Sequence, residues 1–132
     1  MSEAVRDLKN KVIVVTGAGS GIGRALVLHA ASQGMRVVLA DIDASRLAQA
    51  LEAVRERGVE AVGVEVDVGS AQSVEQLAER AYAAFGAVHV LVNNAGIATA
   101  GAAWTLPLET WKRVLDINLY GVIHGVHSFL PR

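Results

Sequence analysis

The chain has 132 residues, 52% of them hydrophobic, which is too apolar for a disordered segment and long enough to bury a core. Its 12 lysines and arginines nearly balance 13 acidic residues, and it has no cysteine, so nucleic-acid partners, disulfide scaffolds and thiolate metal sites are not expected. A polar N-terminus and the lack of any apolar run of about 18 residues predict a cytoplasmic protein without a membrane partner.

Segments rich in β-branched residues predict four strands: Val12–Thr16, Arg36–Ala40, Ala61–Val66 and Val88–Val92. Three of these segments are continuous apolar runs, which is typical of strands buried on both faces of a parallel sheet. The run at 61–66 is weaker, because Gly63 and Glu65 interrupt it. We therefore expect that strand to lie nearer an edge of the sheet.

Helical stretches separate the predicted strands: Gly21–Gln33, Ala44–Arg57 and Ala71–Phe85. Each stretch is followed by a glycine, which adopts the left-handed conformation that ends many helices: Gly34, Gly58 and Gly86. Asp43 and Ser70 are suited to cap the N-termini of the second and third helices. Helices therefore alternate with strands through the first two thirds of the chain.

A last helix is predicted from Pro107 to Leu130, with proline in its first turn. Four apolar residues form a stripe along it: Trp111, Leu115, Leu119 and Val122. Another surface is needed to cover this stripe. The chain ends just as the helix closes, without a strand to follow it.

This element order predicts an α/β fold with a Rossmann-type, doubly wound parallel sheet. Short connections between parallel strands require right-handed crossovers. We expect an incomplete sheet that holds the first four strands in the order 3-2-1-4, with their helices. Residues 1–132 would form one domain, because the sequence shows no linker or internal repeat.

The turn after the first strand has the spacing Gly-x-x-x-Gly-x-Gly, formed by Gly17, Gly21 and Gly23, with Ser20 inside it. Glycines let the backbone approach a pyrophosphate, and a helix N-terminus favours negative charge. The alternative is a turn that is merely flexible. A strand before the turn and a helix after it favour dinucleotide binding.

Asp41 follows the second strand, where a carboxylate can accept hydrogen bonds from the ribose hydroxyls of a dinucleotide. The same carboxylate would repel a 2′-phosphate, so the sequence predicts NAD as the cofactor rather than NADP. The alternative role for Asp41 is a negative charge at the start of the next helix. Asp43 already fills that role, which favours the ribose contact.

The glycine turn and Asp41 are followed along the chain by Asp67-Val68, by the segment Asn93–Gly96 and by the helix that carries Asn118. One protein family has all of these motifs in this order. The chain resembles the N-terminal half of a short-chain dehydrogenase/reductase over essentially all 132 residues. The resemblance implies that further residues surround the cofactor: Ile22 at the diphosphate, Ile42 and Val68 at the adenosine, Asp67 at the adenine, and Asn94, Ala95 and Gly96 beneath it.

The residues alone allow simpler roles for several of these positions. Asp67 is suited to cap the end of a strand, and Val68 to make a core contact. The segment Asn93–Gly96 is suited to a turn that leaves a strand, since asparagine and glycine tolerate unusual dihedral angles. The segment Asn93–Gly96 can form this turn and lie beneath the cofactor at the same time.

By the same resemblance Asn118 belongs to a catalytic tetrad with a serine, a tyrosine and a lysine. A buried amide on an apolar stripe needs hydrogen-bond partners, and a structural bond to nearby backbone is the alternative. The family's serine and its Tyr-x-x-x-Lys lie beyond Arg132. Neither Tyr82 nor Tyr120 is followed by lysine four residues later. The chain alone is therefore expected to be inactive, unstable or self-associating.

The implied function is an NAD(P)-dependent oxidoreductase of an alcohol or carbonyl, of which this chain supplies the cofactor-binding half. The full-length protein is expected to form a homo-oligomer. The alternative is a noncatalytic nucleotide-binding or oligomerisation module that ends at Arg132. No metal is expected, because His124 and His127 lack a third ligand. Trp104 and Trp111 are expected to pack rather than to border a substrate pocket.

Overall fold

The computed structural model describes residues 7–132 and places four strands in one parallel sheet. The strands are β1 (Val12–Thr16), β2 (Arg36–Asp41), β3 (Ala61–Glu65) and β4 (Val90–Val92). Their order is β3-β2-β1-β4 and every neighbouring pair is parallel, which confirms the predicted order 3-2-1-4. The strand that the sequence placed nearer an edge, β3, is an edge strand.

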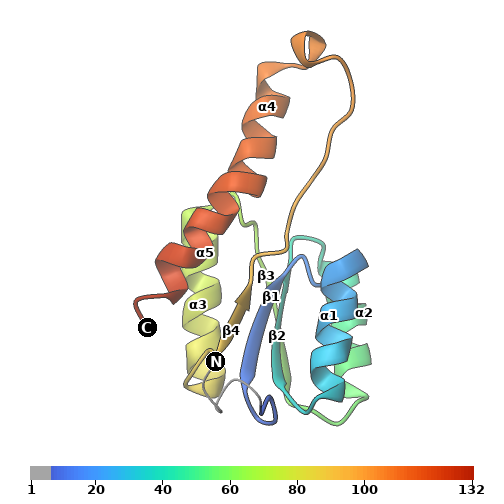
Figure 1. Ribbon diagram of the computed structural model, residues 1–132, viewed down its shortest axis with the longest axis vertical. Helices are drawn as coiled ribbons and strands as arrows, with labels where there is room; N and C mark the ends of the chain where they lie inside the picture. Colours follow the sequence, from blue (N-terminus) through green and yellow to red (C-terminus); the bar gives the residue numbers. More distant parts are fainter. Residues whose placement is uncertain (1–6) are drawn as a thin grey trace.

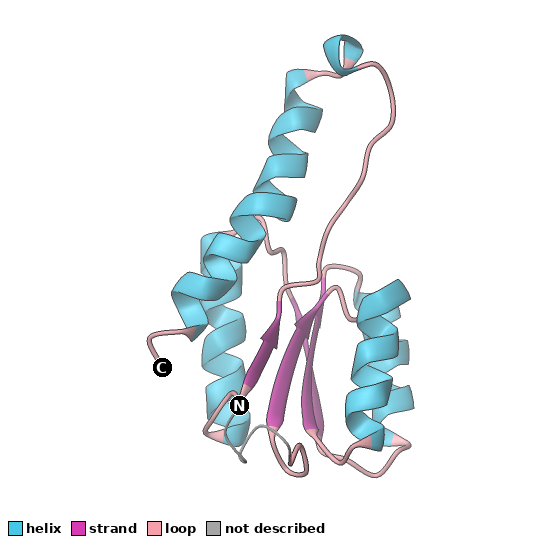
Figure 2. Cartoon of the chain, in the orientation of Figure 1, coloured by secondary structure: helices cyan, strands magenta, loops and turns pink. Residues whose placement is uncertain are grey.

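Helices cover both faces of this sheet (Figures 1 and 2). One face carries α1 (Gly21–Ser32) and α2 (Ala44–Arg55); the other carries α3 (Ala71–Phe85) and α5 (Gly121–Phe129). Both predicted N-caps are confirmed: Asp43 accepts from the Arg46 N–H at 3.0 Å and Ser70 from the Ser73 N–H at 3.3 Å. The glycines after the first three helices all have positive φ, between 73° and 79°.

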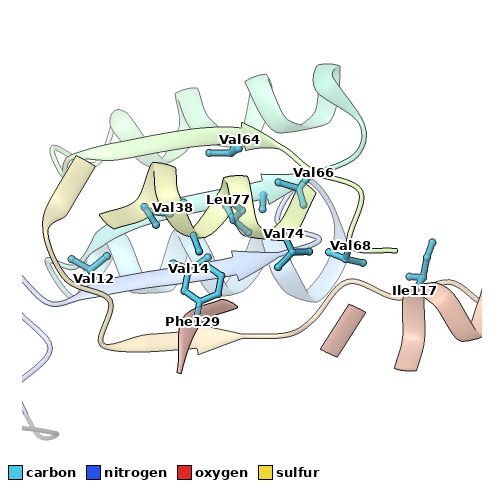
Figure 3. Packing of buried hydrophobic residues seen from close by; sticks show 13 residues of the cluster. Val12, Val14, Val38, Val64, Val66, Val68, Val74, Leu77, Ile117 and Phe129 are labelled. Carbon is cyan, nitrogen blue, oxygen red and sulfur yellow. The ribbon is translucent and has the colours of Figure 1, made fainter. Parts of the chain in front are cut away.

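The core consists of two layers, one on each side of the sheet, and β1 contributes to both. Val12 and Val14 pack toward α3 and α5, in the cluster drawn in Figure 3, whereas Ile13 and Val15 pack toward α1 and α2. Burying each such side chain contributes about 1.5–3 kcal/mol relative to leaving it exposed. The central strand is therefore firmly held, and the turn at its carboxyl end starts from a fixed point.

The strand β4 is shorter and less buried than the sequence predicts. The expected strand from Val88, buried on both faces, is wrong, because β4 begins at Val90 and its residues are only half-buried. The His89 ring takes the place of a backbone acceptor, since its Nδ1 accepts from the Val12 N–H at 2.9 Å. Within the described sheet β4 also lies at an edge, which leaves one side of the strand uncovered.

The helix predicted from Pro107 to Leu130 is confirmed as a continuous helical segment from Leu108 to Phe129, but a π-helical turn interrupts its regular geometry. After a short 3-10 turn, η2 (Ala103–Thr105), come α4 (Leu108–Leu115), the π-helical turn η3 (Asp116–Tyr120) and α5. The π turn adds one residue to a helical turn, which a regular 3.6-residue pattern does not reveal. In Figure 1, α4 projects beyond the carboxyl ends of the strands.

The side chains of α4 and the loop before it are largely exposed. No residue of α4 is buried, and the four stripe residues are between 37% and 51% exposed. The expected packing of the two tryptophans is wrong, since Trp104 is 88% and Trp111 is 45% exposed. Both lie where the chain leaves the sheet and its core. Across residues 7–132, none of the helices has the length and apolarity needed to cross a membrane.

Candidate functional site

A cleft of about 380 Å³ opens at the carboxyl ends of the strands. It lies at the edge of the sheet where open α/β proteins bind ligands. With the exception of Gly23, every residue that the sequence assigned to a cofactor lines this cleft: Gly17, Ser20, Gly21, Ile22, Asp41, Ile42, Asp67, Val68, Asn94, Ala95 and Gly96. The fold therefore brings these distant positions to one place.

Sequence reasoning missed several residues of the same cleft: Ala40, Arg46, Val66, Ile97 and Ile117. Most of them are apolar and are adjacent in the sequence to positions that were predicted. Arg46 is the one charged member of this group, and it lies in the first turn of α2 beside Asp41. A cation one turn into a helix has no local sequence signal that places it in a cleft.

The turn between β1 and α1 depends on its glycines. Gly17 and Gly21 have φ of 65° and 54°, which side chains other than glycine rarely adopt. A Cβ on Gly21 would meet nothing within 4 Å. A Cβ on Gly23 would lie 2.1 Å from the Gly17 carbonyl oxygen. Gly23 therefore allows α1 to pack closely against the glycine turn, although it does not line the cleft.

The N-terminus of α1 is left open toward the cleft. The Ser20 side chain makes no capping hydrogen bond, although Asp43 and Ser70 cap α2 and α3. The first backbone N–H groups of a helix have no partner within the helix, and together with the helix dipole they attract anions. The uncapped N-terminus of α1, where Gly21 has open space around it, is therefore suited to bind the diphosphate of a dinucleotide.

Asp41 joins the two turns that flank the cleft. Its Oδ2 accepts from the Gly19 N–H at 2.8 Å and its Oδ1 from the Asp43 N–H at 2.9 Å. An ionised carboxylate has about four acceptor positions, so capacity remains for ribose hydroxyls. Neighbouring Arg46 is engaged with Asp43 at 3.7 Å. Asp41 thus has a structural role that the sequence did not indicate, beside any role in binding.

Asn94 lies beneath the glycine turn and supports it. Its Nδ2 donates to the carbonyl oxygens of Thr16 and Gly17, at 3.0 and 3.3 Å. The preceding residue, Asn93, turns the other way and faces α5, where a Cβ on Gly125 would lie 2.2 Å from its Oδ1. The two asparagines therefore hold the end of β4 between the turn and the last helix.

Asp67 and Val68 lie between the cleft and the last helix. Asp67 Oδ1 accepts from the Gly69 N–H at 2.9 Å, which is the turn role that the residues alone suggested. Val68 is 8% exposed and belongs to the core, as that reading also expected. The helix side of this loop is tight, because a Cβ on Gly121 would lie 2.8 Å from Val68 Cγ2.

Asn118 lies in the π turn and faces the loop that follows β4. Its Oδ1 accepts from the Ile97 N–H at 2.8 Å, and its Nδ2 donates to the Ile97 carbonyl at 2.7 Å. The expectation of a buried amide is wrong, because Asn118 is exposed while its neighbour Ile117 is buried. Asn118 does not line the cleft itself; it holds Ile97, which does.

The histidines of the last helix are not arranged around a metal. His124 is half-buried and its Nδ1 lies 2.8 Å from the Val68 carbonyl oxygen. In the described part of the chain no three His, Cys, Asp or Glu residues are grouped closely enough to hold an ion. This ring contacts the loop beside the cleft instead.

Comparisons with known proteins identify a family and several relatives of this chain. A family model described as short chain dehydrogenase matches residues 11–132. The chain is 35% identical over 127 residues to a CLA biosynthesis dehydrogenase/reductase of Lactiplantibacillus plantarum, covering 96% of this chain and 44% of that protein. It is 41% identical over 114 residues to an uncharacterized oxidoreductase of Thermotoga maritima, covering 86% of this chain and 44% of that protein.

Solved structures agree. A short chain dehydrogenase/reductase from Burkholderia phymatum, in complex with NAD, superposes with a TM-score of 0.93 at 45% identity. The match covers 95% of this chain and 44% of that one. The chain therefore spans less than half the length of these relatives.

Proposed function

The chain belongs to the short-chain dehydrogenase family, and from that premise we propose that it supplies the cofactor-binding half of an NAD-dependent oxidoreductase of alcohols or carbonyls. The observation that carries this proposal is the uncapped start of α1, which opens onto a cleft beside the glycine turn. The NAD-bound relative from Burkholderia phymatum supports a nicotinamide cofactor at this site. When bound, that cofactor would supply hydride-transfer chemistry.

Each part of the cleft has a group suited to one part of the dinucleotide. The turn of Gly17 and Gly21, with Ser20 and Ile22, would hold the diphosphate through backbone N–H groups. Asp41 and Ile42 would hold the adenosine ribose. The surfaces at 67–68 and 94–96 would border the adenine and the nicotinamide side, respectively.

We assign NAD rather than NADP because of the charge at the ribose position. The Asp41 carboxylate faces the cleft with acceptor capacity left for two hydroxyls, and a 2′-phosphate there would meet like charge. Arg46 stands nearby as a cation, but its guanidinium is already paired with Asp43. The balance of these charges favours NAD.

Asn118 is proposed to take part in catalysis through the shape of its helix. Both polar atoms of its side chain are hydrogen-bonded to the Ile97 backbone. We therefore expect the π turn around Asn118, rather than its side-chain amide, to contribute to the active site. π turns occur frequently at functional sites because they disturb the regular backbone hydrogen bonds of a helix. The proposed partner of the whole protein is a small alcohol or carbonyl compound, and we propose that the protein forms homo-oligomers.

The test uses the product of the complete coding sequence. Binding of NAD and NADP would be measured by calorimetry, and turnover would be followed by nicotinamide absorbance with a panel of alcohols and carbonyls. We expect NAD to bind more tightly than NADP and at least one substrate class to be turned over. Absence of dinucleotide binding would overturn the proposal. Binding without turnover of any substrate would favour the noncatalytic module instead.

A further inference from the structure

We propose that Arg113 is a positioning residue for the purine end of the cleft: it orients the Asp67 carboxylate, which then selects a base with an amino donor. This inference rests on the proposed function, in which Asp67 borders the adenine. Arg113 lies on α4, the helix that projects away from the sheet, and it contributes nothing to the lining of the cleft. Its effect would therefore pass entirely through Asp67.

The Arg113 guanidinium contacts the Asp67 carboxylate through one nitrogen. Arg113 Nη1 is 3.4 Å from Asp67 Oδ1 and 3.3 Å from Oδ2, so it contacts both oxygens. The Gly69 N–H adds a shorter bond, 2.9 Å, to Oδ1 only. Oδ2 is left with Arg113 as its protein donor, and the Asp67 side chain remains 37% exposed at the edge of the cleft. Oδ2 is therefore the oxygen with capacity for a ligand.

The backbone around Asp67 is fixed without Arg113. The Asp67 N–H donates to Ser73 Oγ at 3.1 Å, and the Ser70 N–H donates to the Asp67 carbonyl at 3.0 Å. The loop is also held through the contact between His124 and the Val68 carbonyl. Removing the guanidinium should therefore leave the Asp67 carboxylate held through Oδ1 by the Gly69 N–H, with Oδ2 freer to move, while the loop stays in place.

A carboxylate accepts hydrogen bonds and, when ionised, donates none. The exocyclic amino group of adenine is a donor, whereas hypoxanthine presents a carbonyl oxygen at the same position. An oriented Asp67 should therefore discriminate between these two bases. A carboxylate held through Oδ1 alone would lose part of this discrimination, because Oδ2 could turn away from the carbonyl at lower cost.

The experiment compares the binding of NAD and nicotinamide hypoxanthine dinucleotide to the product of the complete coding sequence. We expect the unmodified protein to prefer NAD, and Arg113→Met to reduce the ratio of the two Kd values by about twofold to fivefold, the range for one solvent-exposed ion pair. Lys112→Met is the matched control. It removes a neighbouring cation on the same helix, one that pairs with Asp116, whereas Arg113 is the one that pairs with Asp67.

A merely structural role for Arg113 would weaken both dinucleotides equally and leave the ratio unchanged, and that result would overturn the inference. The same holds if Lys112→Met changes the ratio as much as Arg113→Met. A third comparison uses Asp67→Asn, on which Arg113→Met should have no further effect on the ratio. If the unmodified protein binds neither dinucleotide, the proposed function fails and this inference fails with it. NAD binding with an unaltered ratio overturns the inference alone.

Discussion

Thr16 and Asn94 are joined by two hydrogen bonds, and Asn94 is the donor in both. Thr16 Oγ1 accepts from the Asn94 N–H at 3.1 Å, and Asn94 Nδ2 donates to the Thr16 carbonyl at 3.0 Å. The same hydroxyl accepts from the Ala95 N–H at 3.0 Å. One side chain at the end of β1 thus ties the glycine turn to the loop that follows β4.

Thr16→Val should therefore destabilise the protein although the two side chains have similar shapes. Thr16 is 5% exposed, and valine would leave the Ala95 N–H without its acceptor, whereas the Asn94 N–H would keep the Val92 carbonyl at 3.0 Å. An unsatisfied group costs about 1–3 kcal/mol, so we expect the free energy of unfolding to fall by about that amount in urea denaturation. Thr16→Ser keeps the hydroxyl and should cost about 1 kcal/mol for the lost methyl group. Equal stability of the two variants would contradict this account.

Much of the fold could be predicted because its signals are local. The strand at Val12–Thr16 is a continuous apolar run, and Asp43 and Gly86 mark helix ends by their own conformational preferences. The glycine turn and Asp41 could be assigned to the cleft from the residues themselves because they follow strand ends, whereas the other predicted lining positions were implied only by resemblance to a family. These signals need no knowledge of distant contacts.

The features that could not be predicted arise from contacts between distant segments. His89 accepts from a residue 77 positions away just before β4 begins, and Arg113 contacts Asp67 across 46 positions. The π turn at Asn118 changes the phase of a helix whose apolar pattern still reads as regular. No local preference specifies these arrangements, because each is decided by tertiary packing.

Replacing Asp41 should change which dinucleotide is preferred. Asp41→Ala removes the charge that would repel a 2′-phosphate, so we expect an NAD preference of about tenfold or more to fall to near parity, as expected for a loss of about 1.4 kcal/mol or more. The measurement is the pair of Kd values for NAD and NADP. Ser70→Ala is the control, since it should cost about 1 kcal/mol of stability by removing the cap of another helix while it leaves Asp41 and Arg46 unchanged. An unmodified protein that prefers NADP would refute the assignment.

Gly23→Ala should impair binding through the shape of the turn. The new Cβ would overlap the Gly17 carbonyl oxygen and the Asn94 amide, at 2.1 and 2.5 Å, and backbone atoms cannot move aside cheaply. We expect about 1–3 kcal/mol of destabilisation and a clear loss of NAD affinity. Gly58→Ala is a control with positive φ but no atom within 4 Å, and strain alone should cost it about 1–2 kcal/mol. Unchanged NAD affinity in Gly23→Ala would contradict the claim that NAD binding needs the close approach of Gly23 to Gly17.

Stability should decline in mildly acidic solution because of His89. Burial, together with nearby Lys11 and Arg36, lowers the pKa of His89 below its usual 6.5. A lowered pKa means that the unfolded chain binds the proton more readily, so stability is complete above pH 6.5 and is lost as pH falls from there toward the lowered pKa. Protonation also removes the acceptor for the Val12 N–H. Denaturation at a series of pH values, with His89→Asn as a variant that cannot titrate, should show a steeper loss for the unmodified protein.

The apolar stripe of α4 and η3 should act as a contact between copies of the protein. Trp111, Leu115 and Leu119 are 45–51% exposed at successive turns, which forms a continuous apolar surface. A stable interface buries about 800 Å² on each partner, and a helix face of this kind can form its centre. A charge in that centre would be desolvated on association, so Leu115→Glu should shift sedimentation velocity profiles toward the smaller species. Leu130→Glu, at an exposed position beyond the end of α5, adds the same charge outside the stripe and should leave the profile unchanged. If both variants sediment like the unmodified protein, the stripe is not the contact surface.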